Sequence, residues 1–518
     1  MNSFRIKNIK SFLDSGDIKI KPITILVGQN SCGKSSLLRF PAVLAQTANY
    51  VGSNPPISFF GENVDYGNFE DVVFGKTGNE ISFSLSYNVD ITGNTRISTD
   101  IGGSRVFVGS RNIIGKATEP IIKNATIEVV IRRIGKSIKV RQVDVSVENT
   151  PISSLRWNDE KKGYSLLLLS MYENNEFVEV REVIEFARDD VTFEKFFPIY
   201  ECDVLKAITT TYGIKISPDR RRTVSKYIFM RSRLNDVPID KELSEEEIRI
   251  ARIHSVFDFS AEIMTSLYTS FNIESKNRIS YIGPFRQNPD RIYRNSETIK
   301  GRVGSKGENV GDILARAYQV EDKALYKKIS RFITEYFGYE LNIHDLGNNY
   351  FQLMLKDKNG IESNLIDVGF GISQVLPIIS EVCVSSLRKN KHLALEINNL
   401  LLVEQPELHL HPAAQAKLAT LFEMCVSANK NARFIIETHS EHLISKLQVL
   451  IADETCPLTS DMVQILYVDK NEEGCAFIEE MKIKENGKFE KEWPTGFFDQ
   501  GYSLSKQLMK ASSKRGKN

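Results

Sequence analysis

The most informative stretch of this chain reads Ile23-Thr24-Ile25-Leu26-Val27-Gly28-Gln29-Asn30-Ser31-Cys32-Gly33-Lys34-Ser35. It begins with an apolar run that is typical of a buried strand, and from Gly28 onward it fits the pattern Gly-x-x-x-x-Gly-Lys-Ser. Leu37 and Leu38 then open a helical segment. A strand, a glycine-rich loop and a helix in this order allow backbone N–H groups to converge on phosphate oxygens. We therefore predict a phosphate-binding loop for ATP.

Each part of this loop has a predicted role. Lys34 supplies a positive charge between the β- and γ-phosphates, and Ser35 offers its hydroxyl to Mg²⁺. A redox role for Cys32 is the alternative to its use as one of the small residues that such a loop needs. We predict that the nucleotide contacts Gly28, Asn30, Ser31, Cys32, Gly33, Lys34, Ser35 and Ser36.

A second apolar strand, residues 400–403, ends in Glu404. A carboxylate at such a strand end can hold Mg²⁺ directly or through water, so Glu404 and Ser35 are the predicted metal ligands. The next residue is Gln405, whose amide can orient a water molecule but cannot accept its proton. General-base assistance is worth roughly 10²–10⁴ in rate. We therefore expect slow hydrolysis unless Glu407 or Glu437 supplies the base.

A third apolar strand, residues 434–436, leads into Glu437, Thr438 and His439. Glu437 and His439 alternate onto one face of the strand, which slightly favours Glu437 over Glu407 as the base. His439 is predicted to donate a hydrogen bond to the γ-phosphate; the alternative is a histidine that only satisfies the strand terminus. The predicted catalytic residues are Glu404, Gln405, Glu407, Glu437 and His439.

Two further features lie near these strands. His409 and His411 could suggest a metal site, but two ligands without a third are better explained as part of a loop. Residues 367–374 form a polar, glycine-rich loop before an apolar helix that starts at Val375. The backbone N–H groups of that loop can bind a phosphate.

The length and the pattern predict an α/β fold made of several parts. A chain of 518 residues exceeds one compact domain. We predict a head with a parallel core sheet, an antiparallel β subdomain and a helical insertion. The predicted boundaries are 1–170 for the first lobe with the phosphate loop, 171–277 for a mainly helical insertion, 278–460 for the second lobe, and 461–518 for a small C-terminal region with a basic tail.

Composition narrows the cellular setting. The net charge is +1, so no global field draws the chain to nucleic acid or acidic membranes. Six scattered cysteines and the lack of a long apolar run predict a reduced, cytoplasmic protein without a membrane partner. DNA binding would need a local patch, for which the candidates are Arg220–Arg222 with Lys215, Lys226, Arg231 and Arg233, or residues 506–517. The alternative for these charges is a solvated helix face.

Together, the three strand-end motifs resemble the ABC-type ATPase heads of the SMC, RecF and OLD group. Residues 64–73, 281–286 and 304–309 are similar to segments of a bacterial ATPase family that ends in a Trp-Pro-x-Gly-Phe-Phe motif. That motif is present here as Trp493-Pro494-Thr495-Gly496-Phe497-Phe498. The resemblance covers roughly residues 1–90 and 278–500. The loop at 367–374 occupies the place of the ABC signature loop but lacks its usual Ser-Gly-Gly-Gln wording.

The resemblance implies a head-to-tail dimer closed by ATP, in which Gly369, Gly371 and Ser373 contact the nucleotide of the partner subunit. OLD-family proteins append a TOPRIM nuclease, and the segment after His439 lacks its Asp-x-Asp cluster of metal-binding acids. ATPases of this build without a nuclease resemble the sensor subunits of the Septu and PARIS anti-phage systems, which hold and release a separate nuclease. The alternative is a RecF- or SMC-like DNA-binding ATPase of repair or recombination. A transporter ATPase is disfavoured by the signature loop.

Overall fold

The computed structural model describes residues 1–52, 54–91, 98–101, 104–107, 120–173, 175–217, 220–225, 243–295, 301–320, 323–387, 398–494 and 507. The chain forms two compact units. The first comprises Met1–Lys19, Val43–Gly61 and Asp65–Asn277, and the second comprises Ile20–Ala42, Glu62–Val64 and Arg278–Asn518. The phosphate loop and the two acidic strand ends therefore belong to the second unit.

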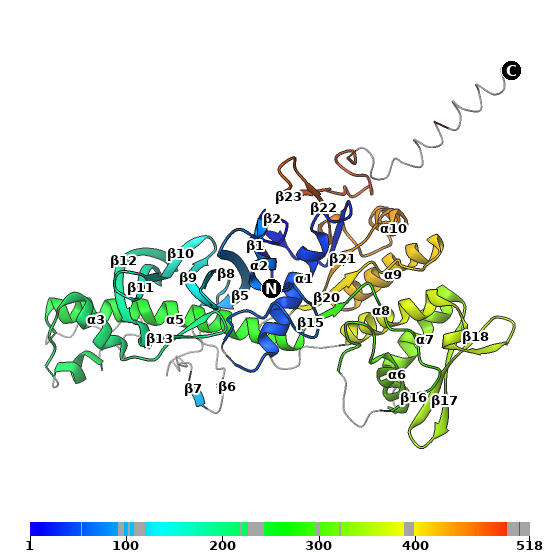
Figure 1. Ribbon diagram of the computed structural model, residues 1–518, viewed down its shortest axis with the longest axis horizontal. Helices are drawn as coiled ribbons and strands as arrows, with labels where there is room; N and C mark the ends of the chain where they lie inside the picture. Colours follow the sequence, from blue (N-terminus) through cyan, green and yellow to red (C-terminus); the bar gives the residue numbers. More distant parts are fainter. Residues whose placement is uncertain are drawn as a thin grey trace. The chain divides into compact units, whose positions relative to one another are not determined.

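The second unit is built on a six-stranded sheet with the order β15-β20-β21-β4-β22-β23. These strands are β15 (Ile279–Ile282), β20 (Asn399–Glu404), β21 (Ala432–Glu437), β4 (Ile23–Gly28), β22 (Val463–Lys470) and β23 (Ala476–Glu480). All neighbours are parallel except β22 and β23, and β20, β21 and β22 lie together in Figure 1. Every residue of β4 and β20 is buried, which explains their unbroken apolar runs. The α/β fold class with a parallel core sheet is confirmed.

Parallel pairing places the carboxyl-terminal ends of β4, β20 and β21 next to one another. Glu404 pairs in register with Glu437, and Glu437 pairs with Leu26, two residues before Gly28. Ligands of open α/β sheets bind at the carboxyl ends of the strands. Motifs that lie far apart in the sequence thus meet at a single site.

Helices and a small sheet complete the second unit. The helices are α1 (Lys34–Asn49, of which residues 34–42 belong to this unit), α6 (Val310–Gln319), α7 (Ala324–Phe337), α8 (Phe370–Leu387), α9 (Pro412–Ala428) and α10 (Glu441–Ala452). The small sheet comprises β16 (Tyr293–Arg294), β17 (Glu340–Gly347), β18 (Tyr350–Lys356) and β19 (Glu362–Asn364). Helix α10 begins where the Ser440 hydroxyl accepts a hydrogen bond from the N–H of Leu443, so the segment after His439 turns directly into a helix.

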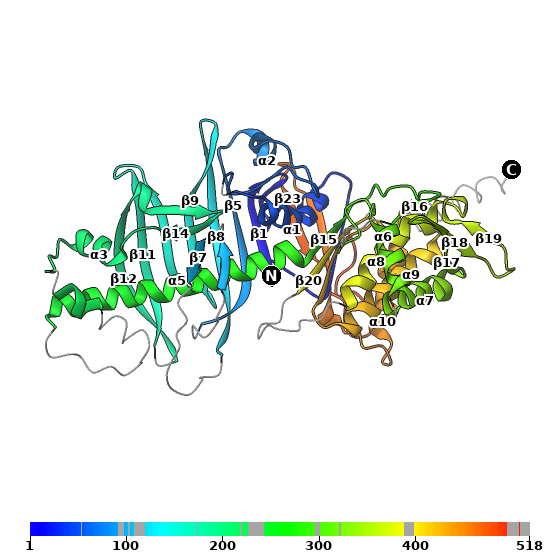
Figure 2. The same cartoon turned by 90° about the horizontal axis from the view of Figure 1, so that it is seen from below.

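The first unit contains a nine-stranded antiparallel sheet. Its strands are β1 (Ser3–Ile9), β2 (Phe12–Asp14), β3 (Ile18–Lys19), β5 (Glu80–Asp90), β8 (Ile122–Ile134), β9 (Ser137–Val147), β10 (Thr150–Asn158), β11 (Gly163–Glu173) and β12 (Glu176–Ala187). The long helix α5 (Glu245–Asn277) contacts β5, β8 and β11 and runs along the sheet in Figure 2. The remaining elements are α2 (Phe69–Val72), β6 (Ser98–Ile101), β7 (Ser104–Phe107), β13 (Val191–Glu194), β14 (Phe197–Tyr200) and α3 (Val204–Tyr212).

The structure corrects the domain boundaries predicted from the sequence. The boundary at residue 170 is wrong, because it cuts strand β11, and the region 171–277 begins with the hairpin partner β12 rather than with helices. Strand β12 carries four glutamates and lies at the end of the described strand order of the antiparallel sheet. The boundary at 461 is also displaced, since β22 pairs with β4 inside the core sheet.

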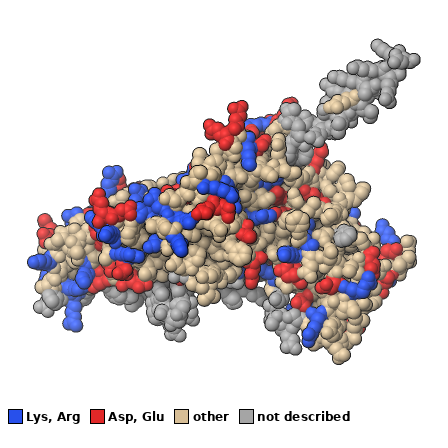
Figure 3. Space-filling view, in the orientation of Figure 1, with Lys and Arg blue, Asp and Glu red and all other residues tan. Residues whose placement is uncertain are grey.

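Two residues of the candidate basic patch around Arg220 are paired with acids of the first unit. Arg220 forms a bidentate ion pair with Glu247, and Arg221 pairs with Asp203. Basic and acidic side chains are also interspersed on the face shown in Figure 3. Residues Lys226, Arg231, Arg233, Lys506, Thr495–Phe498 and 508–517 lie outside the described residues. No helix in the described ranges is apolar enough over sufficient length to span a bilayer.

Candidate nucleotide-binding site

The phosphate loop has a backbone that only small residues can form. Gly28 has φ +145°, and a Cβ atom there would lie 1.9 Å from the carbonyl oxygen of Val468 in β22. Ser31 and Gly33 also have positive φ angles, of 63° and 118°. The close approach at Gly28 and the positive φ angles at Ser31 and Gly33 explain why this loop uses small residues at these positions.

Lys34 is held inside the loop. Its side chain is buried, and Nζ donates hydrogen bonds to the carbonyl oxygens of Gly28, at 3.0 Å, and Gln29, at 2.5 Å. Cys32 is buried beside it, and burial raises the pKa of the Cys32 thiol. A thiol that stays protonated is a poor nucleophile, so the geometry favours the steric explanation of Cys32 over the redox one.

Glu404 is fully engaged by neighbouring side chains. Arg39 of α1 donates to both carboxylate oxygens, with Nε–Oε1 at 2.5 Å and Nη2–Oε2 at 2.7 Å. The hydroxyl of Tyr281 donates to Oε1 at 2.8 Å. The hydrogen bonds that Arg39 donates to Glu404 raise the pKa of Arg39, and burial together with Glu404 raises the pKa of Tyr281. Glu404 therefore anchors α1 and β15 to the end of β20, and binding Mg²⁺ directly would require Arg39 to release it.

Glu437, unlike Glu404, contacts the predicted metal ligand Ser35. The side chain of Glu437 hydrogen-bonds the Ser35 side chain, while its Oε2 is buried and has no hydrogen-bond partner among the described residues. Burial raises the pKa of the Glu437 carboxyl, and the neighbouring Glu404 adds to the effect. A buried, unpartnered carboxylate oxygen next to a serine hydroxyl fits the oxygen donors that Mg²⁺ prefers. The residues present thus fit Mg²⁺, and Ser35 and Glu437 are the residues that would hold it.

Glu407 and His439 are brought together. Glu407 Oε1 accepts a hydrogen bond from the backbone N–H of His439 at 2.7 Å, and Glu407 Oε2 is buried without a partner among the described atoms. Burial raises the pKa of Glu407. Burial and the nearby Lys34 cation lower the pKa of His439, so its ring is neutral at pH 7. A neutral imidazole can donate a hydrogen bond to phosphate without carrying a charge.

The glycine-rich loop at the start of α8 is placed by its own contacts. Arg291 and Asp367 form an exposed bidentate ion pair, with distances of 2.7 and 2.9 Å. Gly369 has φ +74°, and a Cβ at Gly371 would lie 3.2 Å from the carbonyl oxygen of His409.

His411 caps α9 by accepting a hydrogen bond from the N–H of Ala413. No group of three or more potential metal ligands occurs in the part of the chain that is described.

Three residues of this site went unrecognised in the sequence: Arg39, Tyr281 and Arg286. Arg39 follows Lys34 by little more than one helical turn, and Arg286 follows strand β15 after a Gly-Pro pair. The sequence signal for Tyr281 and Arg286 was the strand-to-loop segment itself, since polar residues at the carboxyl end of a parallel strand are candidates for a site. Nothing in the sequence pairs Arg39 with an acid on a distant strand.

Breaking the Arg39–Glu404 pair should destabilise the second unit. Glu404→Gln is expected to lower the free energy of unfolding by about 1–3 kcal/mol, because a buried charge loses its partner. This loss is smaller than the roughly 3–5 kcal/mol expected for a fully buried pair, because 31% of the Arg39 side chain is exposed to solvent. Urea unfolding followed by circular dichroism measures the change.

Asp367→Asn is the matched control, since it removes an ion pair of the same bidentate form that is exposed to solvent. We expect little change from it. An equal decrease in the free energy of unfolding in the two variants would contradict the idea that burial makes the Glu404 ion pair more stabilising than the exposed one. The double variant Arg39→Met, Glu404→Gln should recover part of the loss, because no unpaired charge remains.

Comparisons with known proteins identify a family for most of the chain. A family model described as AAA ATPase domain matches residues 1–444, and one described as a protein of unknown function (DUF3696) matches residues 458–508. No curated protein matches the chain significantly. Similar solved structures include an Smc head bound to the C-winged helix domain of ScpA, with 11% identity, coverage of 93% of this chain and 98% of that one, and a TM-score of 0.37.

Two other structures are similar to the same extent. One is an Smc head domain with an extended coiled coil bound to the C-terminal domain of ScpA, derived from Pyrococcus furiosus, with 12% identity, coverage of 93% and 96%, and a TM-score of 0.37. The other is the SMC head domain from Thermotoga maritima, with 9% identity, coverage of 93% and 99%, and a TM-score of 0.34. TM-scores this low carry no weight for function. The AAA ATPase domain match extends over most of the sequence and ends beyond the His439 strand, and the chain therefore belongs to the AAA ATPase domain family.

Proposed function

We propose that the chain is a slowly hydrolysing ATPase that dimerises head to tail. In this proposal it acts as the sensor subunit for a separate effector nuclease in bacterial anti-phage defence. The observation that carries the proposal is the end of strand β20. There an amide, Gln405, stands next to a carboxylate that is already engaged by Arg39 and Tyr281. A site of this kind holds ATP for long periods, which suits a switch better than a motor.

In this proposal the individual residues have roles that their contacts support. Lys34 and the loop N–H groups hold the β- and γ-phosphates, and neutral His439 donates to the γ-phosphate. Ser35 and Glu437 supply oxygens to Mg²⁺, which when bound neutralises phosphate charge. Gln405 orients the attacking water. The oxygen of this water forms a bond to the γ-phosphorus. The bond between the γ-phosphorus and the bridging oxygen of ADP breaks, and the electron pair of that bond leaves with ADP. The proton of that water passes to a phosphate oxygen, so the products are ADP and inorganic phosphate.

The assignment to a sensor rests on the family resemblance of residues 493–498 and 281–286, together with the slow chemistry expected of Gln405. The glycine-rich loop, with Gly369, Gly371 and Ser373, is proposed to complete the ATP site of a second copy. A loop that carries left-handed glycine at a helix start can present N–H groups to a phosphate on another chain.

Native mass spectrometry tests this proposal on protein purified gently from its own host, with and without ATP and Mg²⁺. We expect a stoichiometric second protein that is bound in one nucleotide state and released in the other. The Lys34→Ala variant, prepared in parallel, should keep the same complex in both conditions. A bare ATP-dependent dimer that carries only DNA would overturn the sensor assignment in favour of a repair or recombination ATPase.

The proposed metal role of Glu437 leads to a prediction of its own. Glu437→Gln is expected to weaken metal binding in the ATP complex by about 10–100-fold, because a charged oxygen donor is replaced by a neutral amide. Mn²⁺ binding measured by electron paramagnetic resonance in the presence of ATP provides a readout that does not depend on turnover. Glu404→Gln is the matched comparison and should weaken Mn²⁺ binding less than Glu437→Gln does. A larger loss of Mn²⁺ binding in Glu404→Gln would instead identify Glu404 as the metal ligand.

A further inference from the structure

The backbone of Gln405 has an uncommon conformation at the centre of the proposed site. Its φ angle is +44°, in the left-handed region that side chains other than glycine, asparagine and aspartate rarely occupy. Such conformations persist only where the surroundings impose them, and they cluster at functional sites. The conformation matters here because it determines the direction in which the Gln405 amide leaves the strand end.

Arg286 is one of the groups that impose it. Its Nη2 donates hydrogen bonds to the carbonyl oxygens of Glu404, at 2.6 Å, and of Gln405, at 3.2 Å. On the other side, the N–H of Gln405 donates to the carbonyl oxygen of Glu437 at 2.8 Å. One guanidinium nitrogen thus bridges the two carbonyl groups that flank the turn from strand into loop.

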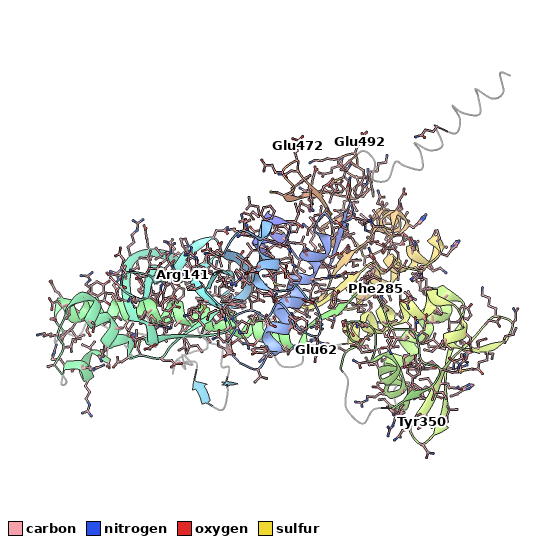
Figure 4. The ribbon with its side chains drawn as sticks, viewed as in Figure 1. Glu62, Arg141, Phe285, Tyr350, Glu472 and Glu492 are labelled. Carbon is pink, nitrogen blue, oxygen red and sulfur yellow. The ribbon has the colours of Figure 1, made fainter. Side chains whose placement is uncertain are left out.

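The fold delivers Arg286 to this position. Strand β15 runs parallel to β20, with Ile282 opposite Val403, so the chain leaving β15 passes the end of β20. The segment is fixed at both ends, because the N–H of Gly283 donates to Ser305 and that of Gln287 to Lys306, each at 2.8 Å. Phe285, labelled in Figure 4, is 84% exposed, whereas Arg286 is only 7% exposed.

This burial is unfavourable for a purely structural residue. Nε and Nη1 of Arg286 are buried and have no hydrogen-bond partner among the described residues. Burial lowers the pKa of Arg286 to about 10, so the guanidinium still carries its charge at neutral pH. Unpartnered buried donors destabilise a fold, and a hydrophobic residue at this position would avoid that penalty. The contacts of Arg286 to Glu404 and Gln405 therefore indicate a role in the chemistry.

We propose that Arg286 is a positioning residue that holds Gln405 in its left-handed conformation and so aims the Gln405 amide at the attacking water. The inference rests on the proposed hydrolysis of ATP at this site. It predicts that Arg286 affects the rate of the chemical step and leaves nucleotide affinity nearly unchanged, because its hydrogen bonds among the described residues go to the carbonyl oxygens of Glu404 and Gln405 and not to the phosphate loop.

A double-mutant cycle tests this. The variants are Arg286→Lys, Gln405→Ala and the two combined, assayed by single-turnover ATP hydrolysis and by equilibrium ATP binding. We expect Arg286→Lys to slow the chemical step by about 10–100-fold, with the Kd for ATP within about twofold of wild type. In the Gln405→Ala background, Arg286→Lys should have no further effect on the rate. Equal losses in both backgrounds would overturn the proposal, as would a loss that appears entirely in ATP affinity.

Arg286→Gln serves as the second variant, because it keeps an N–H donor without burying a charge. It should retain more of the rate than Arg286→Ala, and that gain should also vanish in the Gln405→Ala background. Failure of all the Arg286 variants to fold would overturn the proposal, since it would show a structural role. A wild-type chain that binds ATP without any turnover would instead overturn the proposed hydrolysis itself, so the two failures are distinguishable.

Discussion

Replacing Lys34 with alanine is expected to weaken ATP binding by about 10–100-fold. The Lys34 side chain is buried in the phosphate loop, and its Nζ donates hydrogen bonds to the carbonyl oxygens of Gly28 and Gln29. A charge-assisted hydrogen bond to a phosphate is worth roughly 1.5–3 kcal/mol, and a loss of 1.4 kcal/mol corresponds to a tenfold change in affinity. Nucleotide-dependent dimerisation should disappear with it. Fluorescence titration with a labelled ATP analogue measures the affinity, and light scattering measures the assembly.

Lys21→Ala is the matched control for this variant. Lys21 lies just before β4 in the same unit, and its Nζ also donates to a backbone carbonyl, that of Val463 at 3.4 Å. Its removal should leave ATP affinity within about twofold, since no phosphate contact is lost. If Lys34→Ala bound ATP as tightly as wild type, the assignment of the phosphate loop would be refuted.

The second large effect is a gain in rate. Gln405→Glu is expected to raise kcat by about 100-fold, because a carboxylate at this position can accept the proton of the attacking water while an amide cannot. The two side chains have the same shape, so the left-handed backbone and the Arg286 contacts can be kept. Steady-state ATPase assays at saturating ATP give kcat, and nucleotide affinity should change little. Gln405→Ala, which can neither orient nor deprotonate water, should fall below wild type.

An unchanged rate in Gln405→Glu would have a definite meaning. Another carboxylate would then already act as the base. Glu407 is the candidate for that base, because burial raises the pKa of its carboxyl and its Oε2 has no hydrogen-bond partner among the described residues. The site would in that case not be slow for the reason proposed here.

The phosphate loop was predictable from sequence because all its determinants are local. A strand, a glycine pattern and a helix start occupy one continuous stretch, and the structure places Gly28 at the end of β4 and Lys34 at the start of α1 as that pattern requires. The acidic ends of β20 and β21 were predictable for the same reason, since an apolar run that stops at a charge marks the end of a buried strand. Parallel pairing then brings these ends together.

The domain boundaries were less predictable because strand and helix signals compete in charged segments. Strand β12 carries glutamates at four of its positions and lies at an edge of the antiparallel sheet. An edge strand tolerates this charge, whereas a central strand does not. Strand β22 was assigned to a separate C-terminal region because nothing local shows that its partner is β4, which precedes it by more than four hundred residues.

The amino-acid sequence was enough to establish the type of nucleotide loop, the three strand ends and the amide at residue 405, because each depends on neighbouring residues. The choice of partners among the charged side chains depended on tertiary structure. Arg39 engages Glu404, Glu437 faces Ser35, and Arg286 bridges the carbonyl groups at Gln405. These pairings depend on the strand order and on the direction in which each element leaves the sheet. The sequence contains several acids that could each pair with the same basic side chain. Only the packed sheet, in which β21 separates β4 from β20, determines which carboxylate reaches the phosphate loop.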